Sequence, residues 1–134
     1  MSCSRHHGCM VVRPKRVLVG YDGSDVSRRA LDAAAGLMSY GSSLAVACVT
    51  PEDSHTANVV LSEARERLLD RQLPATYLPL AGDPAERLID AALDVDADLV
   101  VVGSRSHNGT VRQVLGSVSD DVVRRAPCDV LVVR

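Results

Sequence analysis

Short runs of aliphatic and β-branched residues alternate with longer amphipathic stretches from Arg16 to the end of the chain. Five of these runs predict strands, and they lie at 17–19, 44–49, 76–78, 99–102 and 130–133. Several runs are apolar without alternation, which is typical of strands that are covered on both faces. The pattern therefore indicates a buried sheet with helices on both sides.

Four segments between these runs have apolar residues three or four positions apart, the spacing of one helix face. The apolar stripes contain Val26, Ala30 and Leu37; Val60, Ala64 and Leu68; Leu88, Ile89 and Ala92; and Val118 and Val122. We expect the first helix to stop at Gly41 and the third to start at Asp83-Pro84, a capping residue followed by proline. The fourth is expected to start at Gly116-Ser117 and to stop before Pro127.

Strict alternation of strands and helices with short links requires parallel strands that are joined by right-handed crossovers. We interpret residues 16–134 as one doubly wound, Rossmann-like α/β domain with a five-stranded parallel sheet. Residues 1–15 show no periodicity and are expected to form a flexible leader. In such folds the binding crevice lies beyond the carboxyl ends of the strands, so the loops after the first and fourth strands are the first candidates for chemistry.

Composition narrows the possible function classes. The chain has 134 residues, of which 46% are hydrophobic and 24% charged, as expected for one folded domain. A net charge of -2 gives no electrostatic pull toward nucleic acid or membrane, and three tyrosines without Phe or Trp give no platform for stacked bases. Neither a membrane-spanning run nor a signal peptide is evident. We therefore expect a cytoplasmic protein with no nucleic-acid or membrane partner.

The four cysteines are Cys3, Cys9, Cys48 and Cys128, and their even number leaves a disulfide framework open. Cys48 lies within an apolar run and Cys128 opens another. In a reducing compartment, small buried thiols are the ordinary expectation at such positions. We expect no metal site and no structural disulfide in the domain.

The stretch from Gly103 to Ser119 has the composition of an anion site. Glycines let the backbone approach a ligand, and a helix N-terminus presents unpaired N–H groups with a favourable dipole. Ser117 and Ser119 would add hydroxyl donors, and Arg105 and Arg112 would offset phosphate charge. The same residues also fit a plain helix start with Ser117 as its cap, so both interpretations stay open.

Three stretches of the chain together resemble the universal stress proteins. They are VLVGYDGSDVSRRAL, similar to the family's first strand and helix; GDPAERLIDAA, similar to its third crossover; and DLVVVGSR with LGSVSDDVVRRAPCDVLVV, similar to its closing segment. The resemblance covers about Arg16 to Val133 and implies a sheet of strand order 3-2-1-4-5. It also implies a small stress-response or signalling protein that binds ATP together with Mg²⁺.

Members of that family that bind ATP carry a glycine, two residues, a second glycine, nine residues, and then glycine with Ser or Thr. The corresponding positions here are Gly103, Ser106 and Gly116-Ser117, so the spacing is kept and the second glycine is replaced. A side chain at a position that needs positive φ or close approach to phosphate costs on the order of 1 kcal/mol. Ser106 is therefore the departure that bears on nucleotide binding.

The resemblance implies a set of cofactor-binding residues. They are Asp22, Val49, Gly103, Ser104, Arg105, Ser106, Gly116, Ser117, Val118 and Ser119. Asp22 would face the ribose or the base, and Val49 would offer backbone hydrogen bonds to the adenine edge; the glycines and serines would hold the phosphates. Judged from the residues alone, Asp22 is as readily an Asx-turn residue and Val49 a core residue.

Ser106 favours a second function, a dimeric interaction module that binds no nucleotide. Family dimers commonly pair through the last strand, here Val130, Leu131, Val132 and Val133, whose open edge would otherwise promote aggregation. A third class, an enzyme such as an ATP pyrophosphatase or adenylyltransferase, would need a glycine-rich pyrophosphate loop after the first strand or a histidine pair. Asp22-Gly23-Ser24-Asp25 resembles such a loop only loosely, and the domain has no histidine pair, Ser-His-Asp set or Walker-type lysine. We therefore expect no dedicated enzyme, with slow ATP hydrolysis still open and the protein partner unidentified.

Overall fold

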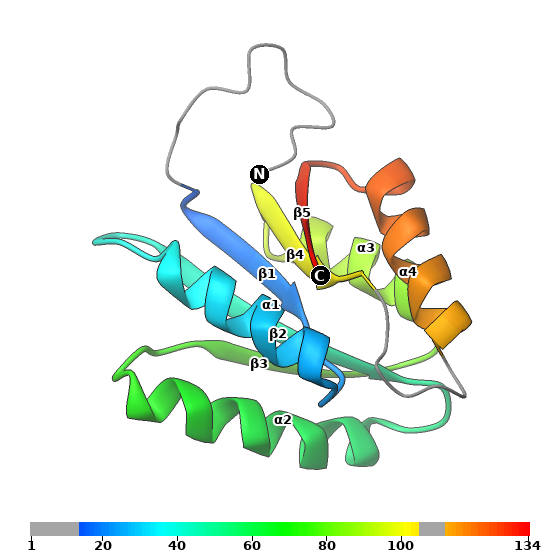
Figure 1. Ribbon diagram of the computed structural model, residues 1–134, viewed down its shortest axis with the longest axis horizontal. Coiled ribbons are helices and arrows are strands. Elements are labelled where there is room, and N and C mark those ends of the chain that lie inside the picture. Colours follow the sequence, from blue (N-terminus) through cyan, green and yellow to red (C-terminus); the bar gives the residue numbers. More distant parts are fainter. Residues whose placement is uncertain (1–13, 105–111) are drawn as a thin grey trace.

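The computed structural model describes residues 14–104 and 112–134, and of residues 112–117 it describes the backbone. The elements are β1 (Arg16–Gly20), α1 (Asp25–Gly36), β2 (Ser43–Thr50), α2 (Ser54–Asp70), β3 (Thr76–Ala81), α3 (Pro84–Asp94), β4 (Leu99–Gly103), α4 (Arg112–Arg125) and β5 (Asp129–Val133). All neighbouring strands pair in parallel, in the order β3-β2-β1-β4-β5 (Figure 1). The predicted fold class and strand order are confirmed.

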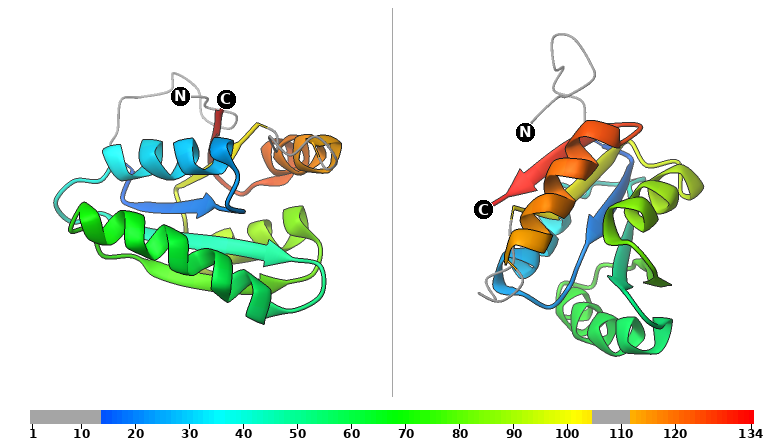
Figure 2. Two further views of the ribbon diagram at one scale, coloured as in Figure 1. Left: turned by 60° about the horizontal axis from the view of Figure 1, so that its bottom comes forward. Right: turned by 90° about the vertical axis from the view of Figure 1, so that its right-hand side faces the viewer.

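Two core layers lie on the two faces of the sheet. Val17 and Val19 of β1 pack in the layer that contains buried residues of α1 and α2, whereas Leu18 packs in the layer that contains those of α3 and α4. Alternate residues of a strand point to opposite faces, and complete burial of a Val or Leu side chain contributes about 1.5–3 kcal/mol. Figure 2 shows α4 alongside β5, at the end of the sheet opposite α2 and β3.

The first helix ends earlier than the sequence predicts. The helix α1 ends at Gly36, and Leu37 N–H closes it with a bond to the Ala34 carbonyl, three residues back, at 3.0 Å. Gly41, the predicted stop, lies in the following turn with φ +87°. The helix therefore closes with a tighter last turn before Gly41 is reached. The predicted start of α3 is confirmed, because the Asp83 side chain accepts from Glu86 N–H and Pro84 opens the helix.

The third strand continues past its predicted end, through Pro79 to Ala81. It is an edge strand, and Gly82 N–H donates to the Thr50 carbonyl of β2 at 2.9 Å. Successive residues of a strand direct their backbone groups to opposite sides, so the nitrogen of Pro79, three residues before Gly82, lies on the outer side. Proline is tolerated there because no neighbouring strand needs its N–H.

The fourth helix starts earlier than expected. Because α4 begins at Arg112, the prediction of a start at Gly116-Ser117 is wrong, and so is the interpretation of Ser117 as the cap. Arg112, Gln113 and Leu115 are good helix formers, and one glycine inside a helix costs only about 1 kcal/mol relative to alanine. Gly116 therefore does not mark a helix boundary.

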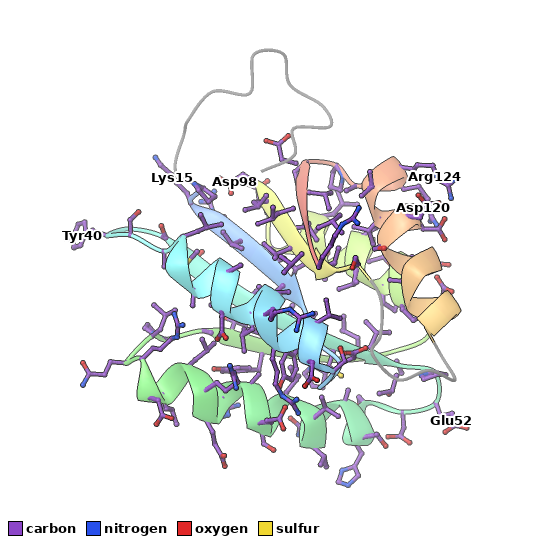
Figure 3. The ribbon with its side chains drawn as sticks, viewed as in Figure 1. Lys15, Tyr40, Glu52, Asp98, Asp120 and Arg124 are labelled. Atoms are coloured by element: carbon purple, nitrogen blue, oxygen red, sulfur yellow. The ribbon has the colours of Figure 1, made fainter. Side chains whose placement is uncertain are left out.

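One carboxylate joins the amino-terminal ends of two neighbouring strands. Asp98 accepts backbone N–H groups from Lys15 at 2.9 Å and from Arg16 at 3.1 Å, which joins the starts of β1 and β4. Figure 3 shows Lys15 and Asp98 close together at this amino-terminal edge, with Glu52, which follows β2, on the far side. The carboxyl ends of the strands, where the sequence places its candidate residues, therefore lie on the side of Glu52.

Cys48 and Cys128 are buried, as expected, whereas Cys3 and Cys9 of the predicted leader lie outside the described residues. Within the described ranges, no helix is long and apolar enough to cross a membrane.

Candidate functional site

A crevice is expected where the strand order reverses. The chain leaves β1 toward α1 on one face of the sheet and leaves β4 toward α4 on the other. Between such neighbouring strands a doubly wound sheet offers its binding position, beyond their carboxyl ends. We call Asp22, Gly23, Ser24 and Ser27 the β1 half of this crevice, and Gly103 and Ser104 with Val118 and Ser119 of α4 the β4 half.

The β1 half is a tight turn fixed by three side chains. Gly23 adopts φ +85°, and Asp22 Oδ1 accepts the Ser24 N–H at 2.9 Å, which makes Asp22 an Asx-turn residue. Ser24 caps α1 by accepting from Ser27 N–H at 3.2 Å, and Ser27 Oγ accepts from Asp22 N–H at 3.3 Å. The exposed Asp22 carboxylate is thus oriented by its own turn. Its predicted contact with a ribose or base stays a prediction.

Cys48 of β2 lies close enough to Asp22 to respond to its charge. Burial raises the pKa of the Cys48 thiol to about 12, and the Asp22 carboxylate adds to this rise. The thiol is therefore protonated and a poor nucleophile at neutral pH. Cys48 serves as packing beside the crevice.

The backbone N–H and C=O of Val49 lie on the β1 side of β2. Tyr21 N–H donates to the Ala47 carbonyl at 2.8 Å, and the pairing of β1 with β2 ends at Gly20 and Ala47. Val49 lies two residues further along β2, so its N–H and C=O point to the same side, past the end of β1. In the described part of the chain, neither group bonds to the turn after β1. A donor and an acceptor are therefore presented together, next to a half-buried aliphatic side chain.

Gly103, at the end of β4, is required by packing. A Cβ atom built on Gly103 would lie 2.8 Å from Cγ1 and 3.1 Å from Cγ2 of Val26, in the first turn of α1. Val26 is itself buried, and a β-branched side chain in a helix has little rotamer freedom with which to move away. The structure shows that this glycine lets α1 sit against β4, and its predicted role in ligand approach stays a prediction.

Ser104 and Ser119 are brought together in the β4 half. Ser104 N–H donates to the Val133 carbonyl of β5 at 2.7 Å, and Ser119 Oγ donates to the Ser104 carbonyl at 3.2 Å. The Ser119 hydroxyl hydrogen is thus directed to the end of β4. Val118 is only 7% exposed and belongs to the core under α3 and α4. Both α4 residues connect the helix to the sheet.

Four members of the predicted set cannot be placed as side chains. Arg105 and Ser106 lie outside the described residues, and Gly116 and Ser117 are described as backbone within α4. Their predicted phosphate contacts stay predictions. In a helix that begins at Arg112, the N–H groups without an intrahelical partner are those of the first turn, upstream of Gly116. Among the described side chains, no group of three or more His, Cys, Asp or Glu residues is placed to hold a metal ion.

Sequence reasoning missed one polar cluster beside the β1 half. The buried Tyr21 hydroxyl donates to the Glu63 carboxylate of α2, and Arg28 of α1 binds the same carboxylate. Burial and then the Glu63 contact raise the pKa of Tyr21 above its ordinary value. The hydrogen bond from Tyr21, followed by those from Arg28, lowers the pKa of Glu63. The one sequence signal for this cluster is the hydroxyl-bearing Tyr21, which directly follows an aliphatic strand.

The topology is that of a doubly wound α/β protein, in which β1 and β4 are the neighbouring strands where the strand order reverses. The universal stress protein family model matches residues 14–134, and the chain therefore belongs to the universal stress protein family. This confirms the resemblance seen in the sequence.

Individual relatives agree with this assignment. A universal stress protein of Thermus aquaticus is 36% identical over 135 residues, covering 90% of this chain and 98% of the relative. One of Mycobacterium tuberculosis is 33% identical over 139 residues, covering 89% of this chain and 95% of the relative. A crystal structure of a universal stress protein in complex with cAMP superposes with a TM-score of 0.76 at 33% identity, covering 92% of this chain and 98% of the other.

Proposed function

We propose that this protein binds an adenine nucleotide, with ATP as the predicted ligand, as a small stress-response or signalling protein. The single observation that carries the proposal is that the N–H and C=O of Val49 lie on the β1 side of β2 and, among the described residues, are not bonded to the turn after β1. Its N–H and C=O match the acceptor and donor on the adenine edge. Guanine in the same pose presents an acceptor where adenine presents the N6 amino donor, so the match is lost.

Asp22 supplies the second contact. Its carboxylate is exposed beside Val49's strand, and one of its oxygens is held by Ser24 N–H, which fixes the direction of the other. An oriented carboxylate is a good acceptor for ribose hydroxyl groups. The solved relative in complex with cAMP, at 33% identity, supports an adenine nucleotide as the class of ligand.

The phosphates would extend toward the β4 half and the start of α4. Helix N-termini favour anions through free N–H groups and the dipole, and α4 begins at Arg112. Mg²⁺ would arrive with ATP, because it keeps several waters and binds phosphate oxygens rather than a full set of protein ligands. The proposed activity is binding, which another protein would read from the nucleotide-loaded surface. Steady ATP turnover that Asp22→Ala abolishes would contradict this.

Calorimetric titration with Mg-ATP, cAMP and GTP tests the proposal. We expect saturable binding of an adenine nucleotide and at least about tenfold weaker binding of GTP, because an unmatched buried polar group costs on the order of 1–3 kcal/mol. Asp22→Ala should weaken binding, and Asp94→Asn, an exposed charge at the far end of α3, should not. Absence of adenine nucleotide binding at millimolar concentration would reject the function.

The alternative function, a dimeric interaction module, is favoured by a difference between the two sheet edges. β3 carries Pro79 with its nitrogen on the outer side, which blocks a further strand, whereas β5 contains no proline. Leu131, Val132 and Val133 of β5 are only half-buried. An open apolar edge of this kind is suited to pairing with a second copy.

A proline on the open edge tests dimerisation. Ser104 N–H donates to the Val133 carbonyl, so by alternation Val132 directs its N–H away from β4. Val132→Pro should therefore remove an outward donor while keeping the β4 ladder, and should yield a monomer in size-exclusion chromatography. The control is Ala81→Pro, because Ala81, like Pro79, directs its backbone nitrogen to the outer side of β3. A Val132→Pro variant that stays dimeric would show that another surface pairs.

A further inference from the structure

The polar cluster beside the β1 half joins three elements at one carboxylate. Tyr21 follows β1, and its hydroxyl donates to Glu63 Oε1 of α2. Arg28 of α1 donates from Nε to Glu63 Oε1 at 3.3 Å and from Nη2 to Oε2 at 3.2 Å. The same guanidinium donates from Nη1 to Asp25 at 2.8 Å. The end of β1 is thus tied to both helices that cover this face of the sheet.

The Tyr21 hydroxyl is not needed for packing. The residue is 2% exposed and belongs to the core layer with α1 and α2. A phenylalanine would bury the same ring without requiring an acceptor. The hydroxyl therefore adds a directional link from β1 to α2, rather than buried area.

The ion pair that receives this hydroxyl contributes little to stability. The Arg28 and Glu63 side chains are 33% and 47% exposed, and ion pairs in contact with solvent are screened and entropically costly. Burial alone thus does not account for a three-way contact at this position. The location of this contact suggests a role in nucleotide binding, since Tyr21 immediately precedes Asp22.

Asp22 is held from both sides. On one side, Tyr21 is fixed by its N–H bond to Ala47 at 2.8 Å and by its hydroxyl bond to Glu63. On the other side, Ser24 N–H binds the Asp22 carboxylate at 2.9 Å. Removing the hydroxyl leaves the second restraint and releases part of the first. The carboxylate would then sample more directions.

We infer that Tyr21, Glu63 and Arg28 form a positioning network that orients Asp22 for the nucleotide. This inference rests on the proposed function. The network touches no ligand; it acts through Asp22 by restricting the turn before binding. A site held in its bound geometry before binding loses less conformational freedom, so breaking the network should weaken nucleotide affinity by about 3- to 10-fold.

A double-variant cycle tests this route. Tyr21→Phe is compared with the unaltered protein, and Tyr21→Phe with Asp22→Ala is compared with Asp22→Ala alone, by calorimetric titration with the adenine nucleotide that binds. If the network acts through Asp22, Tyr21→Phe weakens binding in the first background and has little effect in the second. A merely structural role would lower affinity by the same factor in both.

Two further variants keep the inference falsifiable if Tyr21→Phe is poorly folded. Glu63→Gln retains an acceptor for the hydroxyl and should lose less affinity than Glu63→Leu, which removes it. The matched control is Tyr77→Phe, since Tyr77 is the half-buried tyrosine of β3 beneath Arg65 and lies away from Asp22. It should bind like the unaltered protein.

The outcomes separate the two hypotheses. If the unaltered protein binds no adenine nucleotide, the proposed function fails and the network inference fails with it. If it binds, and Tyr21→Phe and Glu63→Leu bind equally well, only the network inference is overturned. An equal loss in both Asp22 backgrounds would also overturn it.

Discussion

The two halves of the crevice are held by different kinds of contact. In the β1 half, Asp22, Ser24 and Ser27 bond to one another across at most five positions of sequence. In the β4 half, Gly103 packs on Val26, and Ser104 bonds to Val133. Local bonds can form as soon as the turn forms, whereas distant contacts require the complete sheet. Changes in the β4 half should therefore affect the whole fold, and changes in the β1 half mainly the turn and its ligand.

The largest effect is expected from Gly103→Ala. The new methyl group would overlap the branched Val26 side chain, which has 2.8 Å of space available, and overpacking of this kind costs about 1–3 kcal/mol. Urea unfolding measures the loss in free energy of unfolding. Gly36→Ala is the matched control, because a Cβ there meets nothing within 4 Å and alanine is the better helix former.

The overlap itself can be isolated in a second background. In a Val26→Ala protein, Gly103→Ala should cost less than it does alone, because the two residues compete for one space. Equal costs in both backgrounds would show that Gly103 is needed for a reason other than its contact with α1, and the contrast between the halves would weaken.

Ser24→Ala is the corresponding change in the β1 half. Ser24 caps α1 through Ser27 N–H, and loss of a cap costs about 1 kcal/mol. Replacement by glycine costs only a few tenths of a kcal/mol at such positions, so Ser24→Gly should be milder. Thermal unfolding followed by circular dichroism compares the two. A Ser24→Gly protein as unstable as Ser24→Ala would mean that the hydroxyl's burial, and not capping, carries the effect.

In the β4 half, Ser119→Ala should have a smaller effect on stability. It removes the hydrogen bond to the Ser104 carbonyl, and a bond of this type contributes about 0.5–1.5 kcal/mol. We expect faster amide hydrogen exchange at Ser104 and around the end of β5, because Ser104 is also bonded to Val133. Unchanged exchange there would mean that β4 and β5 are joined independently of α4.

The difference between local and long-range contacts also explains which features could be predicted from the sequence. Asp22, Ser24 and Asp83 carry local turn and cap signals, and the structure has an Asx turn and two helix caps at these positions. The sheet order came from the family resemblance and is also confirmed. By contrast, nothing near Gly103 in the sequence indicates that Val26 will lie on it.

Two other features differ from what local patterns predict, one through a long-range contact and one through a misleading local signal. Tyr21 is hydrogen-bonded to Glu63, 42 positions away in sequence, and no local pattern predicts that these two residues pair. Gly116 suggests a helix boundary, but the residues before it favour a helix and α4 begins at Arg112. In each case a partner or a neighbouring segment, and not the residue itself, decided the outcome.

The smallest effect is expected from the Glu63 carboxylate, which accepts the Tyr21 hydroxyl. The Tyr21 hydroxyl and Arg28 hold the pKa of Glu63 below its ordinary value of 4.5. A carboxyl with a lowered folded pKa stabilises the fold above its unfolded pKa, and this contribution is lost as pH falls through the folded value. Glu63→Gln should therefore lose less stability on acidification below about pH 4.5 than the unaltered protein, by less than about 1 kcal/mol, because the pair is solvent-screened. Denaturant unfolding at several pH values measures it, with exposed Glu66→Gln on the same helix as the control. Identical acid profiles for the Glu63→Gln and unaltered proteins would show that this cluster adds no charge-dependent stability to the β1 half.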